Sequence, residues 1–342
     1  MSTIRYFSKN PSPVNRQLKK VRYKMKPHHL TLFFKAVEAG GKRLSLELCT
    51  NRKLNIQKIK EIYPPFCSVT WLDNKINNIT KHPTIRLSQE LLENDINVLI
   101  HLPGRIYDKI EMLEILTAIK NIGVKNILVV QGEKSLGESK DDFPYACNLL
   151  EFIRQKFNDY FCIGVTGYPL GHPRSGSLDE DLLHLKEKVI AGADFIITQA
   201  IFDVDTFRNF SMQCRDLGIN VPILPGLFII NSYSSLMNMV KFCKLHLPDD
   251  VIKFVEEHKD DKEIVEEYGI SSVVNILENL FRIDAIHCVH IFTLNDLDTL
   301  EKGEQTAHCF GSIGKFLRPV QNSLTGKRIR EDASESIETS SD

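Results

Sequence analysis

The sequence lacks the patterns that would indicate bound zinc, dithiol chemistry or a membrane span. It contains eight cysteines, but no two of them stand at the CxxC spacing that chelates zinc or supports dithiol exchange. No apolar run approaches the ~20 residues needed to cross a bilayer, and the N-terminus has no apolar secretory signal. The formal net charge of -1 gives no global attraction to nucleic acid or to a membrane surface. We therefore expect no metal site and no nucleic-acid or membrane partner.

The cysteines that are present favour a cytoplasmic protein. Cys49, Cys67, Cys162 and Cys288 lie in apolar runs, which is typical of buried, reduced, structural thiols. The oligomeric state stays open, a homo-oligomer included, because the outer helices of a globular domain pack equally well against solvent or against a second copy.

Both ends of the chain differ in composition from the middle. Residues 1–27 carry eight Lys or Arg and no Asp or Glu, which predicts a flexible basic arm. A mitochondrial transit peptide is the alternative, since such segments are also basic and poor in acid. Residues 306–342 have few large apolar residues and end in Ser, Glu and Asp, which predicts a largely disordered tail. We expect the folded domain over residues 28–305.

Eight short apolar runs alternate with longer amphipathic stretches in this middle region. Several runs, such as ILVV and FIIT, are apolar throughout, as expected of parallel strands that helices cover. One amphipathic stretch begins with Ser177, three residues before Glu180, which is the signature of a capping box. The eight runs are residues 43–48, 66–72, 96–102, 126–132, 160–168, 195–202, 221–228 and 285–294.

This alternation suits either a barrel or an open doubly wound sheet. The count of eight and a span close to the typical ~250 residues favour the barrel. No GxGxxG follows the first strand, so the dinucleotide-binding fingerprint of the open sheet is missing. We therefore predict an α/β protein with a single (β/α)₈ TIM barrel.

Polar residues stand at the carboxyl end of every predicted strand, where barrel enzymes build their active sites. A buried strand end carries such groups only if something satisfies them. Each residue alone has the alternative of a structural role, but eight ends together indicate a site. In chain order the residues include Glu47, Thr70, His101, Gln131, Tyr168, Gln199, Gly226, His290, Thr293 and Asn295.

Several longer blocks resemble methylenetetrahydrofolate reductases. The longest runs from Thr166 to Phe207, and LSLEL, SVTW, PYACNLLEFIR, VPILPGLF and HIFTLN agree in the same order. The resemblance covers about residues 30–300. It implies a barrel with non-covalent FAD that uses NAD(P)H to reduce 5,10-methylenetetrahydrofolate to 5-methyltetrahydrofolate, in one-carbon and methionine metabolism.

The resemblance also implies roles for individual residues. Glu47 matches the acid that protonates the bridging nitrogen of the substrate, and an apolar barrel mouth would raise its pKa toward neutrality. The positions implied for substrate are Glu133, Gln199, Phe292 and Asp296. The positions implied for FAD are Thr70, His101, Gln131, Gly132, Glu133, Tyr145, Ala146, Tyr168, His172, Asp181, His184 and Lys188, of which the last three have the spacing of one helix face.

The family pattern breaks at two of these places. The family usually has Arg-Gly-Asp where this chain has Gln131-Gly132-Glu133, and an arginine where it has Asp296. An unpaired Asp296 would repel a folate carboxylate. Two interpretations follow: a working reductase with altered folate recognition, which the retained Glu47 favours, or a flavin-binding barrel with impaired folate chemistry and a regulatory or scaffolding role. The chain ends soon after the barrel, so we expect no regulatory domain and no inhibition by S-adenosylmethionine.

Overall fold

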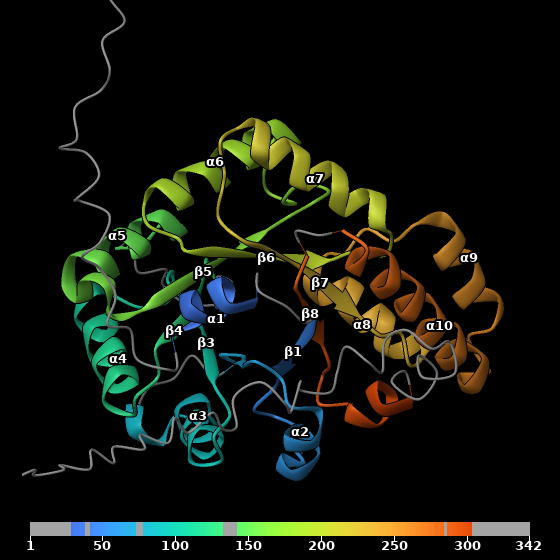
Figure 1. The fold of residues 1–342 in the computed structure, drawn as a ribbon, viewed down its shortest axis with the longest axis horizontal. Helices are drawn as coiled ribbons and strands as arrows, with labels where there is room; N and C mark the ends of the chain where they lie inside the picture. The colour runs from blue at the N-terminus through green and yellow to red at the C-terminus, as the bar shows by residue number, and fades with distance from the viewer. Residues whose placement is uncertain (1–28, 38–41, 73–77, 133–141, 284–285, 303–342) are drawn as a thin grey trace, which may run out of the picture.

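A computed structural model describes residues 29–37, 42–72, 78–132, 142–283 and 286–302 (Figure 1). Within them, eight parallel strands form a closed barrel in chain order, and β8 pairs with β1. Each predicted run coincides with one strand, although β3 extends one residue past its run, so the prediction of a (β/α)₈ barrel is confirmed. The predicted basic arm and the tail lie outside the described residues. The strands are β1 (Arg43–Leu48), β2 (Cys67–Val69), β3 (Val98–Pro103), β4 (Asn126–Val130), β5 (Cys162–Gly167), β6 (Phe195–Ala200), β7 (Ile223–Phe228) and β8 (Cys288–Phe292).

Helices surround this barrel, with one elaboration after β7. There, two additional helices, α8 (Tyr233–Cys243) and α9 (Asp249–Glu257), precede the long α10 (Lys262–Phe281), which leads back to β8. None of the described helices is long and apolar enough to cross a bilayer. The other helices are α1 (Leu30–Val37), α2 (Ile56–Ile62), α3 (Pro83–Glu93), α4 (Lys109–Asn121), α5 (Ala146–Phe157), α6 (Leu178–Ile190) and α7 (Val204–Asp216), with single 3₁₀ turns η2 (Ile79–Lys81) and η3 (Asn158–Tyr160).

The predicted start of α6 is correct at Ser177, whose side chain accepts a hydrogen bond from the backbone N–H of Glu180. The reciprocal half of the capping box is not formed. The Glu180 carboxylate instead accepts the N–H of Gly176, 2.7 Å away, one residue before the cap. The acidic side chain therefore ties the preceding loop to the helix.

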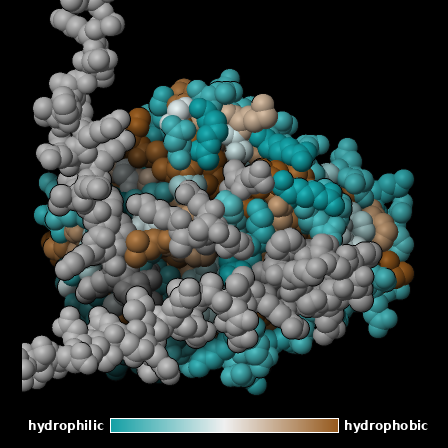
Figure 2. Space-filling model, in the orientation of Figure 1, coloured by the Kyte–Doolittle hydropathy of each residue, from teal (hydrophilic) through white to brown (hydrophobic). Residues whose placement is uncertain are grey.

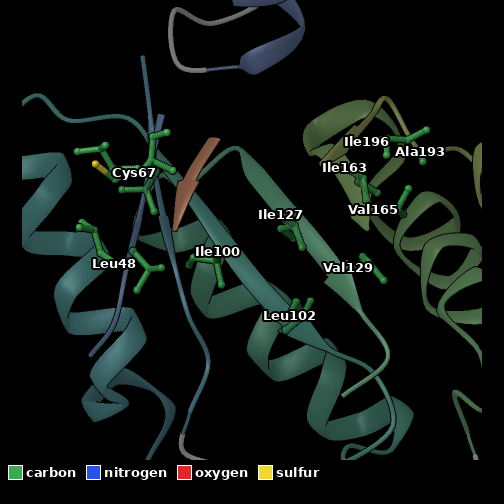
Figure 3. Close-up of a cluster of buried hydrophobic side chains, with 14 of the residues drawn as sticks. Leu48, Cys67, Ile100, Leu102, Ile127, Val129, Ile163, Val165, Ala193 and Ile196 are labelled. Atoms are coloured by element: carbon green, nitrogen blue, oxygen red, sulfur yellow. The ribbon is translucent and has the colours of Figure 1, made fainter. Parts of the chain in front are cut away.

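Alternation along the strands creates two apolar layers. Outward-facing side chains such as Ile100, Val129 and Val165 pack between the strands and the helices (Figure 3). Inward-facing side chains such as Leu128 and Phe195 fill the barrel itself. Each such buried side chain contributes about 1.5–3 kcal/mol relative to exposure.

Helix α1, which the strand pattern did not predict, closes the amino end of the barrel. Leu30 and Phe34 join the inner apolar layer, and the Phe34 ring lies 5.0 Å from that of Phe195. The N–H of Leu30 donates to Asn126 Oδ1 at 2.9 Å, at the first residue of β4. Figure 1 views this end, with α1 lying across the strands. A ligand site is therefore left to the opposite, carboxyl end.

The outer helices on this face of the barrel present mainly hydrophilic residues. Figure 2 shows largely hydrophilic residues over the outer helices on this face, with apolar patches between them. Ile190 on α6 and Met212 on α7 are exposed by 76% and 64%. Isolated apolar residues of this kind are ordinary on protein surfaces.

Candidate active site

The carboxylate of Glu47 and the ring of His101 meet inside the carboxyl end of the barrel. Glu47 Oε2 lies 3.8 Å from His101 Nε2, and the two side chains are only 12% and 14% exposed. Burial raises the pKa of Glu47 to about 7 and lowers the pKa of His101 to about 4. Near neutral pH, Glu47 therefore holds a proton in a large fraction of molecules while His101 stays uncharged.

His101 Nε2 is one of the few buried side-chain atoms without a hydrogen-bond partner among the described residues. The 3.8 Å separation from Glu47 is too long for a hydrogen bond. A buried polar atom without a hydrogen-bond partner is unfavourable. A ligand at the barrel mouth that forms a hydrogen bond with His101 Nε2 would therefore gain binding free energy.

A second polar layer lies directly below. Ser45 and Ser68 precede Glu47 and Thr70 by two residues and so share their inner face. Their hydroxyls hydrogen-bond to the two ring nitrogens of His290, at 2.8 and 3.1 Å. Burial lowers the pKa of His290 to about 3, so the ring is neutral. The strand-end prediction included His290 among the site residues, but here the ring links three strands beneath the mouth.

Thr293 and Asn295 also have structural roles. The Thr293 hydroxyl donates to the backbone carbonyl of Glu47. Asn295 Oδ1 accepts the N–H of Cys49, and Asn295 Nδ2 donates to the carbonyl of Cys49, both at 2.8 Å. These bonds tie the end of β8 to the end of β1 and so position the Glu47 backbone.

Polar groups after β5 gather beside Tyr168. The Tyr168 and His172 rings meet edge to face at 4.5 Å. Lys188 on α6 donates to the carbonyl of Thr166 at 3.1 Å, and burial lowers the pKa of this lysine despite the nearby Asp181. These side chains combine an aromatic surface with positive charge.

His184 does not share the face of Asp181 and Lys188. Three residues turn a helix by about 300°, whereas seven bring it back almost in register. Asp181 is accordingly buried, while the half-exposed His184 ring contacts Glu187 at 3.1 Å and Glu180 at 3.8 Å. The prediction of one common face is wrong for His184.

The end of β4 carries a cation from another loop. Gln131 Oε1 accepts a hydrogen bond from Arg174 Nη1 at 3.2 Å, and Gln131 Nε2 donates to the carbonyl of Pro144 at 3.1 Å. Arg174 follows His172, so the loop after β5 supplies positive charge next to the position where the expected arginine is missing. The family resemblance did not indicate Arg174 as a site residue. Its place between the predicted contacts His172 and Asp181 could have indicated it, because a basic residue there can reach the same ligand.

Gly132 adjoins this contact with a φ of +78°, and a Cβ there would lie 2.9 Å from Pro103 Cβ. The position therefore requires glycine. Tyr145 is the N-cap residue of α5 and is 63% exposed, and Ala146 is half-buried. Glu133, predicted to contact both FAD and substrate, lies outside the described residues.

The remaining predicted residues line the mouth on other sides. The Thr70 hydroxyl lies 3.4 Å from the Leu48 carbonyl. Phe292 ends β8 half-buried, and its ring meets that of His290 edge to face at 5.4 Å. Gln199 and Tyr168 line a cavity of about 270 Å³ between the ends of β5 and β6 and the segment that joins α8 to α9.

Asp296 is not the unpaired charge that the sequence predicted. Its carboxylate accepts the N–H of Thr299 at 3.1 Å, the Thr299 hydroxyl at 2.8 Å and Asn231 Nδ2 at 2.5 Å. Residues 297–302 are helical, so Asp296 caps that helix. These hydrogen bonds lower the pKa of Asp296 even though burial opposes them. The charge is satisfied within the fold.

Comparison with known proteins agrees with this barrel. The family model "Methylenetetrahydrofolate reductase" matches residues 49–302. The chain belongs to the methylenetetrahydrofolate reductase family. Glu47 precedes the matched segment by two residues. The match of Glu47 to the family's acid therefore stays a prediction from the sequence resemblance, to which the structure adds the burial of Glu47 and its position 3.8 Å from His101.

Two curated relatives of the reductase family illustrate the match. A probable methylenetetrahydrofolate reductase (NADPH) of Caenorhabditis elegans is 30% identical over 246 residues, which are 70% of this chain and 37% of the relative. A probable NADH enzyme of Oryza sativa is 35% identical over 248 residues, which are 68% of this chain and 41% of the relative. The chain thus spans about two fifths of the length of these relatives.

A solved structure shows the same fold at lower similarity. It is an uncharacterised protein from Clostridium thermocellum, described as binding two copies of 5-methyl-5,6,7,8-tetrahydrofolic acid. It is 15% identical to this chain, with a TM-score of 0.59, and the match covers 82% of this chain and 99% of that one.

Proposed function

We propose that this protein uses NAD(P)H and FAD to reduce 5,10-methylenetetrahydrofolate to 5-methyltetrahydrofolate. The observation that carries the proposal is the Glu47 carboxyl, buried at the end of β1 with a pKa of about 7. Ring opening of the substrate needs a proton on its bridging nitrogen, and a carboxylic acid that titrates near neutrality is suited to donate one. Family membership supports the same reaction.

The residues at the mouth fit a flavin dinucleotide. The unpartnered Nε2 of His101 can pair with the polar edge of a flavin ring. Gly132 leaves the backbone after β4 without a side chain, and Arg174 and Lys188 supply positive charge for a pyrophosphate. Thr70, Tyr145, Ala146, Tyr168, His172, Asp181 and His184 stay predictions for the same ligand.

The protein's own residues would supply the acid and the orientation. When bound, FAD supplies the hydride. Glu47 donates its proton to the bridging nitrogen of the folate, and the adjacent His101 stays neutral because burial disfavours its charged form. An uncharged neighbour does not stabilise the Glu47 carboxylate, so the acid keeps its proton to a higher pH. The Gln199 amide can orient the pterin through one donor and one acceptor.

The alternative of a barrel with impaired folate chemistry loses part of its support. It rested on the missing arginines at Gln131 and Asp296. Arg174 brings a guanidinium to Gln131, and the Asp296 carboxylate is satisfied as a helix cap. Arg174 therefore offsets the loss at Gln131, and at Asp296 the carboxylate is no longer an unpaired charge, although the arginine itself is absent there.

The test is anaerobic flavin spectroscopy on the purified protein. We expect a flavin spectrum, loss of the visible absorbance on adding NAD(P)H, and its return on adding methylenetetrahydrofolate. Glu47→Gln should keep the first two steps and slow the folate-dependent step by at least about 100-fold, the usual contribution of a positioned acid. A protein that rejects added FAD, or one whose absorbance returns equally fast with Glu47→Gln, would overturn the proposal.

A further inference from the structure

The cavity of about 270 Å³ beside the barrel mouth is enclosed by three segments of the chain. One wall follows β5, a second is the end of β6 with the start of α7, and the third joins α8 to α9. Tyr168 and Gln199 line the cavity, and the family resemblance assigns them to FAD and to folate. None of the other predicted FAD or substrate positions that the structure describes lines it. The cavity therefore adjoins the mouth but is not accounted for by either ligand.

The walls of this cavity are largely apolar. Leu170, Ile201 and Leu247 contribute aliphatic side chains. Pro169 and Pro248 also line it, and the fixed φ of proline restricts the backbone of both walls. Pockets that enclose a whole drug-sized ligand measure about 300–1,000 Å³. A cavity of about 270 Å³ therefore suits one flat ring system with its sugar better than a whole dinucleotide.

Lys244 and His246 bring hydrogen-bond donors to the cavity from the segment between α8 and α9. Both residues are exposed, and neither side chain has an ion pair or a hydrogen bond within the described part of the chain. Burial lowers the pKa of His172, and the positive charge of Lys244 contributes to the same shift. Lys244 therefore lies close enough to the mouth to interact with His172, and its ammonium group remains available to a ligand.

The carboxylate that lines the cavity already has its hydrogen bonds. Asp203 caps α7, and its two oxygens accept the N–H of Thr206 at 2.6 Å and the Thr206 hydroxyl at 2.7 Å. Asp203 belongs to the wall after β6, whereas Lys244 belongs to the wall between α8 and α9. Asp249 and Asp250 follow in the first turn of α9 and do not line the cavity. An anionic group would therefore be attracted to the wall that carries Lys244.

We propose that this cavity binds the adenosine end of NADPH, with the 2′-phosphate on Lys244 and His246, so that the protein prefers NADPH to NADH. The inference rests on the proposed function, because the nicotinamide has to reach a flavin at the mouth. Tyr168 and Gln199 connect the cavity to the mouth, so the two ends of one dinucleotide can occupy both. The apolar walls suit the faces of an adenine ring. A phosphate forms charge-assisted hydrogen bonds with lysine, and the 2′-phosphate is the group that NADH lacks.

NADH is the main alternative occupant. Proteins usually select it with a carboxylate that accepts a hydrogen bond from the ribose 2′-hydroxyl. Asp203 would have to supply that carboxylate, but both of its oxygens already accept hydrogen bonds from Thr206. Lys244 and His246 have no such contacts to lose, so the available groups favour a phosphate.

The adenosine of FAD fits the cavity less well. Its predicted contacts include Ala146 and Asp181, which lie on α5 and α6. Neither residue lines the cavity, whose walls come from β5, β6 and the segment between α8 and α9. The adenosine of a second dinucleotide is therefore the better candidate.

The experiment compares nucleotides with and without the 2′-phosphate on the FAD-loaded protein. Anaerobic reduction of the flavin at increasing NADPH or NADH gives an apparent Kd for each. Calorimetry with adenosine 2′,5′-bisphosphate and with 5′-AMP measures binding without turnover. In both pairs we expect the ligand with the 2′-phosphate to bind about tenfold more tightly, as for two partly exposed charge contacts. The difference should fall as salt increases.

Substitutions assign this preference to the cavity. Lys244→Gln should reduce it about fivefold, and His246→Ala about twofold. Glutamine keeps a long polar side chain at position 244, where φ is +52°, so the change tests the charge and not the backbone. Lys241→Ala is the matched control, because it removes an exposed lysine of α8 that does not line the cavity. It should leave the preference unchanged.

Equal affinity for NADPH and NADH, or an equal effect of Lys241→Ala and Lys244→Gln, overturns the inference and leaves the reductase proposal intact. A preference for NADH would also overturn it and would assign the cavity to a ribose hydroxyl at Asp203. A flavin that neither nucleotide reduces would refute the proposed function itself. The binding of the two adenosine phosphates would still test the cavity in that case.

Discussion

The buried acid makes a prediction about stability that needs neither cofactor nor substrate. Burial moves the pKa of Glu47 from 4.5 to about 7. At about 1.4 kcal/mol for each tenfold change in proton affinity, ionised Glu47 costs the folded state roughly 3 kcal/mol. The folded protein holds this proton more tightly than the unfolded chain, so the free energy of unfolding falls as pH rises from 4.5 to about 7. Below the lower value the cost is absent, and above the higher one it is complete.

Glu47→Gln removes the carboxylate and keeps nearly the same volume. We therefore compare the free energy of unfolding of the variant with that of the unmodified protein at two pH values. The advantage of the variant should be larger at about pH 8 than at about pH 5, by roughly 2 kcal/mol. Chemical denaturation of the apoprotein at both pH values measures this difference, and the midpoint of thermal unfolding should differ by several degrees. Glu114→Gln on the exposed face of α4 is the control and should show no such trend. Parallel stability profiles for Glu47→Gln and the unmodified protein would refute a desolvated acid at the mouth.

Three further substitutions test contacts that hold the site. Gly226→Ala would press a Cβ against the β6 backbone and to 2.7 Å from the Phe292 ring, so we expect about 2 kcal/mol of destabilisation in denaturant titrations. Asp296→Arg should cost about 1–2 kcal/mol of unfolding free energy by removing the helix cap, whereas Asp296→Asn should stay close to the unmodified protein; gain of stability by the arginine variant would contradict the cap. Arg154→Met breaks the 2.7 Å ion pair with Asp194 and should destabilise by about 2 kcal/mol, with the Arg154→Met/Asp194→Asn double variant losing less than the sum of the two single changes.

The strands could be predicted because buried strands appear in the sequence as short apolar runs. The run 43–48 agrees with β1 residue for residue, whereas the runs 66–72 and 285–294 exceed β2 and β8 at both ends. Apolar character continues past the last ladder hydrogen bond, since strand ends remain buried under neighbouring loops. Helix α1 was not predicted, because its role in closing the barrel depends on contacts with inner residues such as Asn126, far along the chain.

Some residues of the candidate site could be predicted from the sequence, and others are apparent only from the structure. Glu47 and His101 could be predicted, because both are polar residues at the ends of apolar strands and such strands converge in a barrel. The contact of Arg174 with Gln131 joins residues 43 positions apart in separate loops, and no periodicity encodes a loop that returns to a neighbouring strand. The wrong prediction of the helix face of His184 has a different cause. A residue three positions after Asp181 lies near the border of the Asp181 face, so the spacing alone does not decide whether its side chain is buried or exposed.

By itself the sequence predicted the barrel, the family and a carboxyl group at the end of the first strand, because these depend on local residue types and on strongly patterned strands. Only the tertiary structure decided which polar groups meet at the mouth and which support it from below. Two positions show this most directly: Gln131, where a neighbouring loop brings Arg174, and Asp296, whose carboxylate is satisfied as a helix cap. The physical reason is that charge and hydrogen bonding act between neighbours in space, and loops of the barrel bring together neighbours that are far apart in the chain.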